Sequence, residues 1–157
     1  MSPALPMLRD GVYQEEHRRI RQRLARVLRL ASRDAGFPSA LGALIALADE
    51  IEALLPVLTV HFNRGDRALR EAAAAEPERL QASELLIAEH RPLLRELTAL
   101  LESTRRVIED LRAGQPVDSL AEALKAYLSA CVEDILAHED AEYAICGLSD
   151  ETPEPRP

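Results

Sequence analysis

The sequence predicts an all-α protein that folds as an up-down-up-down four-helix bundle. Its 157 residues suffice for one domain with a sizeable core. Leu, Ala, Glu and Arg, all strong helix formers, dominate the composition, and aromatic residues make up only 3 %. Three breaks rich in proline, glycine and polar residues divide the chain into four long segments, each with apolar residues at helical spacing. Short connections between long helices favour antiparallel neighbours.

The first two helices are separated by the break DAGFPSA at residues 34–40, and the second ends before AEPERLQ at residues 75–81. The first helix has an inward stripe of Tyr13, His17, Ile20, Leu24, Val27 and Ala31. The second has a stripe of Leu44, Leu47, Ile51, Leu54, Leu58, His61, Gly65 and Leu69. Pro56 removes one hydrogen bond within the second helix, which permits a local kink there.

The third and fourth helices are separated by RAGQPVDS at residues 112–119, and Pro77 suits the first turn of the third. The third helix, which contains Pro92, has a stripe of Leu86, His90, Leu93, Leu97, Leu100, Val107 and Leu111. Ser119-Leu-Ala-Glu122 has the form of a capping box at the start of the fourth. The fourth stripe consists of Leu120, Leu124, Tyr127, Cys131, Ile135, His138, Glu142 and Ile145. We therefore expect a bundle domain over residues 10–148, a flexible N-terminus over 1–9 and a disordered tail over 149–157.

The distribution of charge bears on the partners of the protein. The net charge is −8, so a nucleic-acid partner is not expected overall. Residues 9–33 carry eight Arg against three acidic residues, a local charge of +5, and residues 119–151 carry eight acidic residues against one Lys, a local −7. A basic helix could bind nucleic acid or an anionic membrane. We favour the interpretation that the first and last helices lie side by side and offset each other's charge. The sequence leaves the oligomeric state open.

The sequence also favours a cytoplasmic location. No apolar run approaches the length that spans a bilayer. The start MSPALPMLRDG lacks the charged and apolar regions of a signal peptide. Cys131 and Cys146 would lie about 22 Å apart on one helix, too far for a disulfide, which fits a reducing compartment.

The four histidines are the most informative residues. Each predicted helix carries one on its inward stripe, namely His17, His61, His90 and His138. In an antiparallel bundle all four fall within about one to two helical turns of one level, which makes an inward-facing ring. Four independent core histidines, each with a local hydrogen bond, would be the alternative, but burying several imidazoles without partners is costly. A transition metal would supply the partners.

A carboxylate extends this pattern. Glu142 follows His138 by four residues, so both lie on one face of the last helix and could chelate one metal or bridge two. Two His and a carboxylate suit Fe(II), and bundle cores are known to hold di-iron sites. An exposed glutamate is the alternative for Glu142. Glu16 and Glu89 precede two of the histidines and could orient the ligands or be solvated. Tyr13 and Tyr143 could line the site, although packing at the bundle end is favoured for both.

The ordered set of His17, His61, His90 and His138 with Glu142 resembles the hemerythrin-like (HHE cation-binding) family. The similar stretches are YQEEHRRIRQRL, LPVLTVHF, LLIAEHRPLLREL and ILAHEDAEYAI, and the resemblance covers roughly residues 10–148. It implies a four-helix bundle with a non-haem di-iron site bridged by carboxylates. It also implies binding or sensing of O₂ or NO, iron handling or a response to oxidative stress.

The sequence departs from the family pattern at Gly65, where the family has a glutamate four residues after the second histidine. Asp66 lies about 100° further round the helix and could point inward only through a distortion such as a π-bulge. Glu139 and Asp140 are expected to be displaced from the inward stripe in the same way. One carboxylate is therefore expected in the ligand set, and Gly65→Glu is expected to raise metal stoichiometry or affinity.

Three interpretations follow for the ligand set of His17, His61, His90, His138 and Glu142. The first is an asymmetric di-iron site that uses water or Asp66 in place of the missing bridge. The second is a mononuclear site for iron or another metal such as zinc. The third is a metal-free bundle that acts as a regulatory or interaction module.

No arrangement of residues predicts rapid catalysis. Cys131 lies about 10 Å from His138 along the helix, which is too far for a nucleophile and its base. There is no phosphate-binding glycine loop, no dinucleotide-binding turn and no Cys-x-x-Cys pair. We therefore expect a protein that binds a small diatomic ligand, senses it or handles iron, rather than an enzyme.

Overall fold

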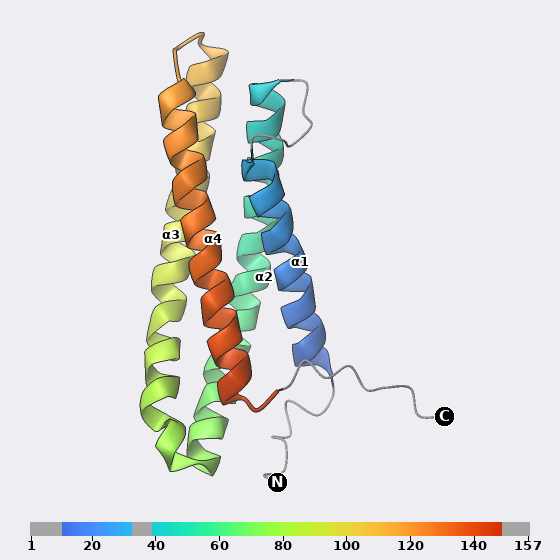
Figure 1. The fold of residues 1–157 in the computed structure, drawn as a ribbon, viewed down its shortest axis with the longest axis vertical. Helices are drawn as coiled ribbons and strands as arrows, with labels where there is room; N and C mark the ends of the chain where they lie inside the picture. Colours follow the sequence, from blue (N-terminus) through green and yellow to red (C-terminus); the bar gives the residue numbers. More distant parts are fainter. Residues whose placement is uncertain (1–10, 33–38, 149–157) are drawn as a thin grey trace, which may run out of the picture.

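The computed structural model describes residues 11–32 and 39–148, which form four long helices (Figure 1). These are α1 (Val12–Ala31), α2 (Ala40–Ala75), α3 (Leu80–Arg112) and α4 (Asp118–Ile145), with a short 3₁₀ turn, η2 (Pro77–Arg79), before α3. Successive helices run in opposite directions, so the predicted all-α up-down-up-down bundle is confirmed. The expected flexible N-terminus over 1–9 and disordered tail over 149–157 lie outside the described residues.

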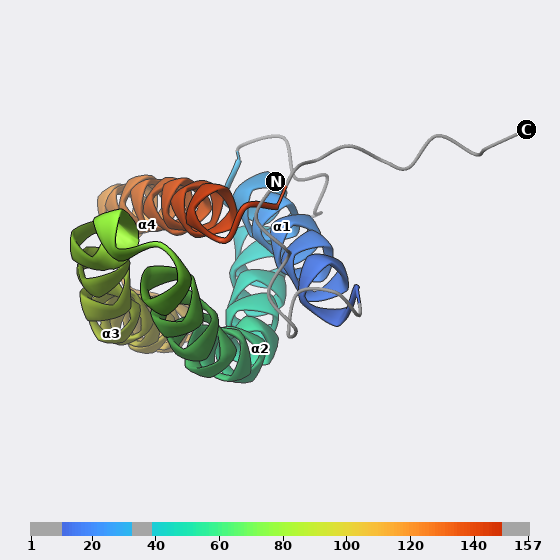
Figure 2. The same ribbon diagram turned by 90° about the horizontal axis from the view of Figure 1, so that it is seen from below.

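Each helix packs against its neighbours in the sequence, and α1 also packs against α4 (Figure 2). The basic first helix and the acidic last helix therefore lie side by side, as their charges predict. Arg21 of α1 pairs with Asp140 of α4. Arg23 and Arg26 of α1 pair with Glu50 of α2, at 3.1 Å each. A surface pair such as Arg21–Asp140 contributes about 0–1 kcal/mol, so these pairs complement the packing rather than drive it.

The start of α2 and the end of α3 carry residues that are typical of helix ends, whereas the start of α4 does not. Ser39 caps α2, because its side-chain oxygen accepts a hydrogen bond of 3.1 Å from the Gly42 amide. Gly114 follows α3 with a φ of 75°, a conformation that favours glycine. The predicted capping box at Ser119 is wrong, because α4 begins at Asp118 and the N-cap position is Val117, which makes no side-chain cap. Val117 is buried, so its packing fixes the start of α4.

The inward stripes predicted for the first two helices are buried throughout. In α4 the prediction was wrong at Leu120 and Tyr127, which are 52 % and 68 % exposed. Tyr127 and Leu128 both lie at helical spacing from Leu124 and Cys131, so periodicity alone does not choose between them. The helix is turned so that Leu128 is buried. In α3, similarly, Leu101 is buried whereas Leu100 is half-buried.

The apolar core is divided into two parts by the layer of histidines. The larger part contains Ile20, Leu58, Leu97 and Ile135 together with most of the other buried aliphatic side chains. The smaller part, near the turn between α2 and α3, consists of Tyr13, Ala68, Leu69, Leu86 and Cys146. Polar side chains thus lie in the middle of an otherwise apolar interior, where they require partners. Over the part of the chain that the structure describes, no helix has the length and apolar character needed to cross a bilayer.

Both cysteines are buried and neither is in a disulfide. Burial raises the pKa of Cys131 and that of Cys146 to about 12 each. We predict that a thiol reagent such as Ellman's reagent titrates neither cysteine rapidly in the native protein, because little thiolate forms and access is blocked. Both should react at once in guanidinium chloride. Rapid native titration of Cys131 would contradict the packing of α4.

Candidate metal centre

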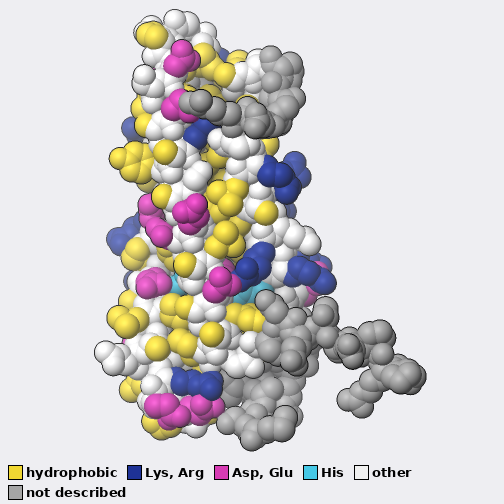
Figure 3. Space-filling model, in the orientation of Figure 1, with side chains coloured by type: hydrophobic (Ala, Val, Ile, Leu, Met, Phe, Trp, Pro, Cys, Tyr) yellow, Lys and Arg dark blue, Asp and Glu magenta, His cyan; other side chains and the backbone are white. Residues whose placement is uncertain are grey.

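The four predicted histidines meet inside the bundle, one from each helix. Their exposed fractions are 3 % for His17, 1 % for His61, 4 % for His90 and 3 % for His138. They form two pairs rather than one ring, since the ring centroids of His17 and His61 are 4.5 Å apart and those of His90 and His138 are 4.7 Å apart. On the face drawn in Figure 3, only small areas of histidine side chain are visible.

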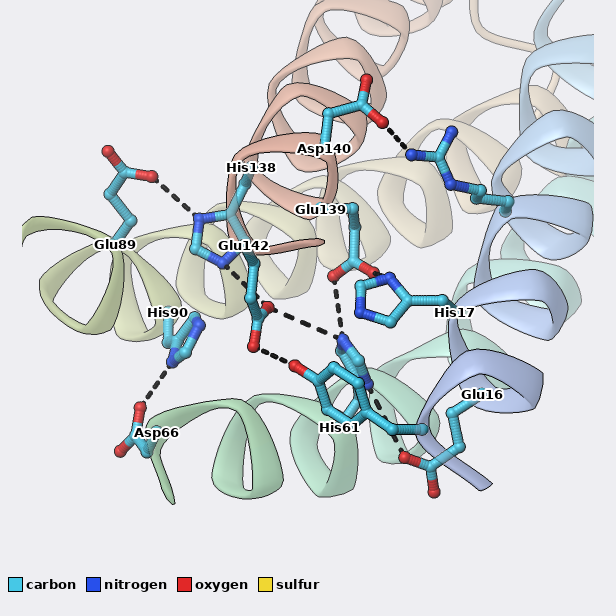
Figure 4. A network of polar contacts seen from close by, with 12 residues as sticks. Glu16, His17, His61, Asp66, Glu89, His90, His138, Glu139, Asp140 and Glu142 are labelled. Carbon is cyan, nitrogen blue, oxygen red and sulfur yellow. Dashed lines mark hydrogen bonds and ion pairs between the residues drawn. The ribbon is translucent and has the colours of Figure 1, made fainter. Parts of the chain in front are cut away.

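Glu142 lies between the two histidine pairs (Figure 4). Its side chain is fully buried, so the exposed-glutamate alternative is wrong. Its Oε2 atom is 3.7 Å from Nε2 of His61 and 3.7 Å from Nε2 of His138. Two groups of three residues each offer ligand atoms within 4.8 Å of one another, and Glu142 belongs to both. These groups are His17, His61 and Glu142, and His90, His138 and Glu142.

Glu139 is a buried member of the centre that the sequence analysis missed. It is fully buried, with Oε2 at 2.7 Å from Nδ1 of His17 and Oε1 at 3.2 Å from Nε2 of His61. The expectation that Glu139 is displaced from the inward face was wrong, because that face of α4 is two positions wide. Cys131 and Val132, one heptad earlier, are also both buried, and this adjacent apolar pair was the available signal. Asp140, by contrast, is exposed.

The charges of Glu139 and the histidines are coupled. Burial by itself would raise the pKa of Glu139, but the contacts with His17 and His61 outweigh it and lower that pKa to about 2. Burial lowers the pKa of His61, and the neighbouring Glu139 and Glu142 raise it by more, so the net shift is upward. The pKa of His90 is lowered, chiefly by burial. Glu139 is thus an ionised carboxylate beside His17 and His61. On the other side of the centre, burial favours the neutral form of His90.

A carboxylate faces the Nδ1 atom of every histidine (Figure 4). For His17 it is Glu139, described above. Asp66 lies 2.6 Å from Nδ1 of His90, and Glu89 lies 2.8 Å from Nδ1 of His138. Glu16 lies 3.7 Å from Nδ1 of His61. In a neutral imidazole, an Nδ1–H that donates to a carboxylate leaves the lone pair on Nε2.

Each of these four carboxylates faces a histidine on another helix. Glu16 precedes His17 in the sequence but faces His61, and Glu89 precedes His90 but faces His138. Asp66 does not replace the missing carboxylate of the second helix, because α2 runs through it as an α-helix and its side chain contacts the outer nitrogen of His90. The sequence analysis identified Glu16 and Glu89 as candidates, and only the tertiary structure pairs each with its histidine.

The Nε2 atoms of all four histidines are buried, and none makes a hydrogen bond to a described residue. Both carboxylate oxygens of Glu139 and Oε2 of Glu142 share this condition. A buried polar atom without a hydrogen bond costs about 1–3 kcal/mol. These nitrogen and oxygen atoms are the kinds of ligand that divalent transition metals take. The donor set therefore fits one or two bound metal ions, of an identity that the geometry leaves open.

Tyr13 lines the centre rather than only packing at the end of the bundle. Its phenol O–H donates a hydrogen bond to Oε1 of Glu142. Its ring stacks on His61 with the centroids 5.1 Å apart. Burial and the charge of Glu142 raise the pKa of Tyr13 well above its usual value, so the phenol keeps its proton and remains a donor. Tyr143 also contacts the centre, with its ring edge-on to His17 at 5.2 Å.

Gly65 provides the space that the Glu142 carboxylate occupies. A Cβ atom at Gly65 would lie 2.1 Å from Oε1 of Glu142, closer than any real contact. The sequence analysis expected one carboxylate in the centre, but the structure places two there, Glu139 and Glu142, both from α4. The sequence analysis expected Gly65→Glu to raise metal affinity by adding a missing carboxylate. The structure does not support that reason, because the new side chain would displace the Glu142 carboxylate.

A surface pocket of about 340 Å³ between α2 and α3 reaches the outer side of the centre. Asn63, Asp66, Arg70, His90 and Arg91 contribute to its walls. The pocket thus brings solvent up to the Asp66–His90 contact, on the opposite side of His90 from its inward-facing nitrogen.

Comparison of the chain with protein-family models, with curated proteins and with solved structures gave no match. The resemblance to hemerythrin-like proteins therefore stays a prediction that rests on the ordered histidines and Glu142.

Proposed function

We propose that the histidine–carboxylate centre binds transition-metal ions, with iron as the expected metal. In this proposal the protein is a hemerythrin-like non-haem iron protein that binds or senses O₂ or NO, or handles iron. The observation that carries it is the buried Nε2 atom of each histidine, which makes no hydrogen bond, close to the buried carboxylates of Glu139 and Glu142. Nδ1 of His90 and Nδ1 of His138 are each hydrogen-bonded to a carboxylate, that of Asp66 and that of Glu89. That is the arrangement in which an outer carboxylate orients a histidine ligand.

The donor atoms suggest two unequal metal positions. The position beside His17 and His61 has Glu139 and Glu142 as further donors, whereas the position beside His90 and His138 has Glu142 alone. Fewer protein donors leave more coordination positions for an external ligand. The first pair of histidines would then hold its metal more completely, and the second pair would accept the small ligand. Iron supplies redox activity and open coordination positions that side chains alone lack.

The same contacts explain how the bundle tolerates the centre without metal. The contacts with His17 and His61 lower the pKa of Glu139 and so stabilise its buried negative charge. Tyr13 donates a hydrogen bond to Glu142, and this bond offsets part of the free energy that burial of the Glu142 carboxylate costs. We therefore expect the metal-free protein to be folded but less stable than the loaded protein, as linkage between binding and folding requires.

Elemental analysis and an optical spectrum of untagged protein, purified without oxygen and reconstituted with Fe(II), test the proposal. We expect two iron ions per chain and, after oxidation, a charge-transfer band. One ion per chain would favour the mononuclear alternative, and zinc in place of iron would remove the role in O₂ or NO binding. Absence of stoichiometric metal after reconstitution with Fe(II), Co(II) and Zn(II) would contradict metal binding and favour a regulatory or interaction module.

A stability measurement separates the same alternatives. In a metal-free module, His90→Leu would be neutral or stabilising, since it removes an imidazole that is 4 % exposed and has an unpaired Nε2. In a metal protein, the variant would lose the part of the stabilisation by Fe(II) that comes from the ion beside His90 and His138, read as a smaller difference in Tm with and without metal than in the wild type.

A further inference from the structure

We propose that Tyr13 and Gly65 are positioning residues that hold the Glu142 carboxylate between the two histidine pairs. The inference rests on the proposed metal-binding function and adds how the shared ligand is controlled. Glu142 belongs to α4, but Tyr13 on α1 and Gly65 on α2 determine where its carboxylate lies. Three helices therefore fix the one residue that both candidate metal positions share.

Gly65 acts through the space it leaves. The three atoms nearest to a Cβ built on it all belong to Glu142, namely Oε1 at 2.1 Å, Cδ at 3.0 Å and Oε2 at 3.3 Å. Gly65 lies inside α2 and does not have a positive φ, so the backbone does not require glycine there. Glycine has a low helix propensity, but it is the residue that leaves room here for the Glu142 carboxylate. Any larger residue would push Glu142 away from α2.

Tyr13 acts through its hydroxyl group. The O–H donates to Oε1 of Glu142 and so leaves Oε2 facing His61 and His138, at 3.7 Å from Nε2 of each. The ring is fixed by two contacts, stacked on His61 and edge-on to His17 with a centroid distance of 4.8 Å. Only 3 % of Tyr13 is exposed, so water does not readily replace this donor.

Removing either residue should weaken metal binding at one of the two positions and leave the other nearly unchanged. His138 is on the same helix as Glu142, one turn away, so a carboxylate released from Tyr13 or displaced from Gly65 stays closer to His138 than to His61. The ion beside His17 and His61 would lose the shared ligand, and the ion beside His90 and His138 would keep it. Loss of an outer positioning partner typically lowers metal affinity by about 10- to 100-fold.

The first experiment tests the packing without metal. A double-mutant cycle compares the Tm of metal-free wild type, Gly65→Ala, Glu142→Ala and the double variant. In the Glu142→Ala background, Gly65→Ala should raise the Tm, because alanine favours the helix and the carboxylate no longer fills the space. In the wild-type background the same change should give a smaller rise or a fall. Equal rises in both backgrounds would overturn the role of Gly65.

The second experiment titrates metal-free protein with Co(II), followed by calorimetry and by the visible spectrum. Wild type should bind two ions, whereas Tyr13→Phe and Gly65→Ala should bind one ion normally and the other about 10- to 100-fold more weakly. Tyr127→Phe is the matched control, because this tyrosine is 68 % exposed on α4, and it should bind like wild type. Unchanged binding in both test variants would overturn the inference while leaving the proposed function intact.

A spectrum of the Fe(III) form distinguishes positioning from direct ligation by Tyr13. A phenolate ligand would give a charge-transfer band that disappears in Tyr13→Phe, and finding it would overturn the positioning role. If wild type binds no Co(II), the proposed function fails and the metal role of Tyr13 and Gly65 fails with it. The metal-free cycle would still report whether Gly65 accommodates Glu142, so the two failures are distinguishable.

Discussion

Glu142→Gln is expected to abolish tight metal binding at both histidine pairs. The substitution keeps the size of the side chain but removes the negative charge and one ligand oxygen from the residue that both candidate groups contain. Its effect should exceed the about 10- to 100-fold loss of affinity that removal of an outer partner causes. Calorimetric titration with Co(II) and metal content after anaerobic reconstitution with Fe(II) measure it.

Two variants serve as controls for this result. Glu133→Gln removes the same charge from an exposed position on α4 and should bind metal like wild type. His90→Ala removes a donor from only one of the two groups and should leave one ion bound. Wild-type stoichiometry and affinity in Glu142→Gln would show that Glu142 is not a shared ligand.

Leu128→Ala is expected to lower the free energy of unfolding by about 2–5 kcal/mol, the usual cost of truncating a fully buried leucine. Leu128 is fully buried and belongs to the larger part of the core. Guanidinium chloride denaturation of the protein in the presence of a chelator measures the change. Leu128 lies ten residues before His138, about 15 Å along the helix, so metal binding should be unaffected at temperatures where the variant is folded.

Tyr127→Ala provides the comparison, because it removes a larger side chain from the adjacent position. Tyr127 is 68 % exposed, and its loss should change the free energy of unfolding by no more than about 0.5 kcal/mol. A larger cost for Tyr127→Ala than for Leu128→Ala would mean that α4 is rotated about its axis relative to the structure described here. That rotation would also move Glu139 out of the centre.

Much of the histidine–carboxylate centre was predictable from periodicity. The spacing from Tyr13 through His17 to Ala31, and from Leu44 through His61 to Leu69, named inward positions that are all buried. Histidine on each stripe then implied a shared layer, because the distance of each histidine from its helix end puts all four near one level of an antiparallel bundle. Glu142 followed from its separation of four residues from His138.

The failures arise where two adjacent positions satisfy the same spacing. Tyr127 and Leu128 both fit the spacing of the inward stripe, but only Leu128 is buried. At His138 and Glu139 one buried residue was expected, and both are buried. A difference of one residue is a rotation of about 100°, and small changes in helix orientation decide which side chain it buries. A stripe one residue wide is therefore a poor guide on α4, where adjacent positions are buried at Cys131 and Val132 and again at His138 and Glu139.

Local chemistry specified four amphipathic helices and put one histidine of each into the interior, because a 3.6-residue period needs only neighbouring residues to establish it. The assembled bundle added what depends on distances between helices. It paired Glu16 with His61 and Glu89 with His138, brought Glu139 inside, and placed the Glu142 carboxylate against Gly65. These contacts join residues far apart in the chain, so they depend on how each helix is rotated and packed, which periodicity within one helix does not encode.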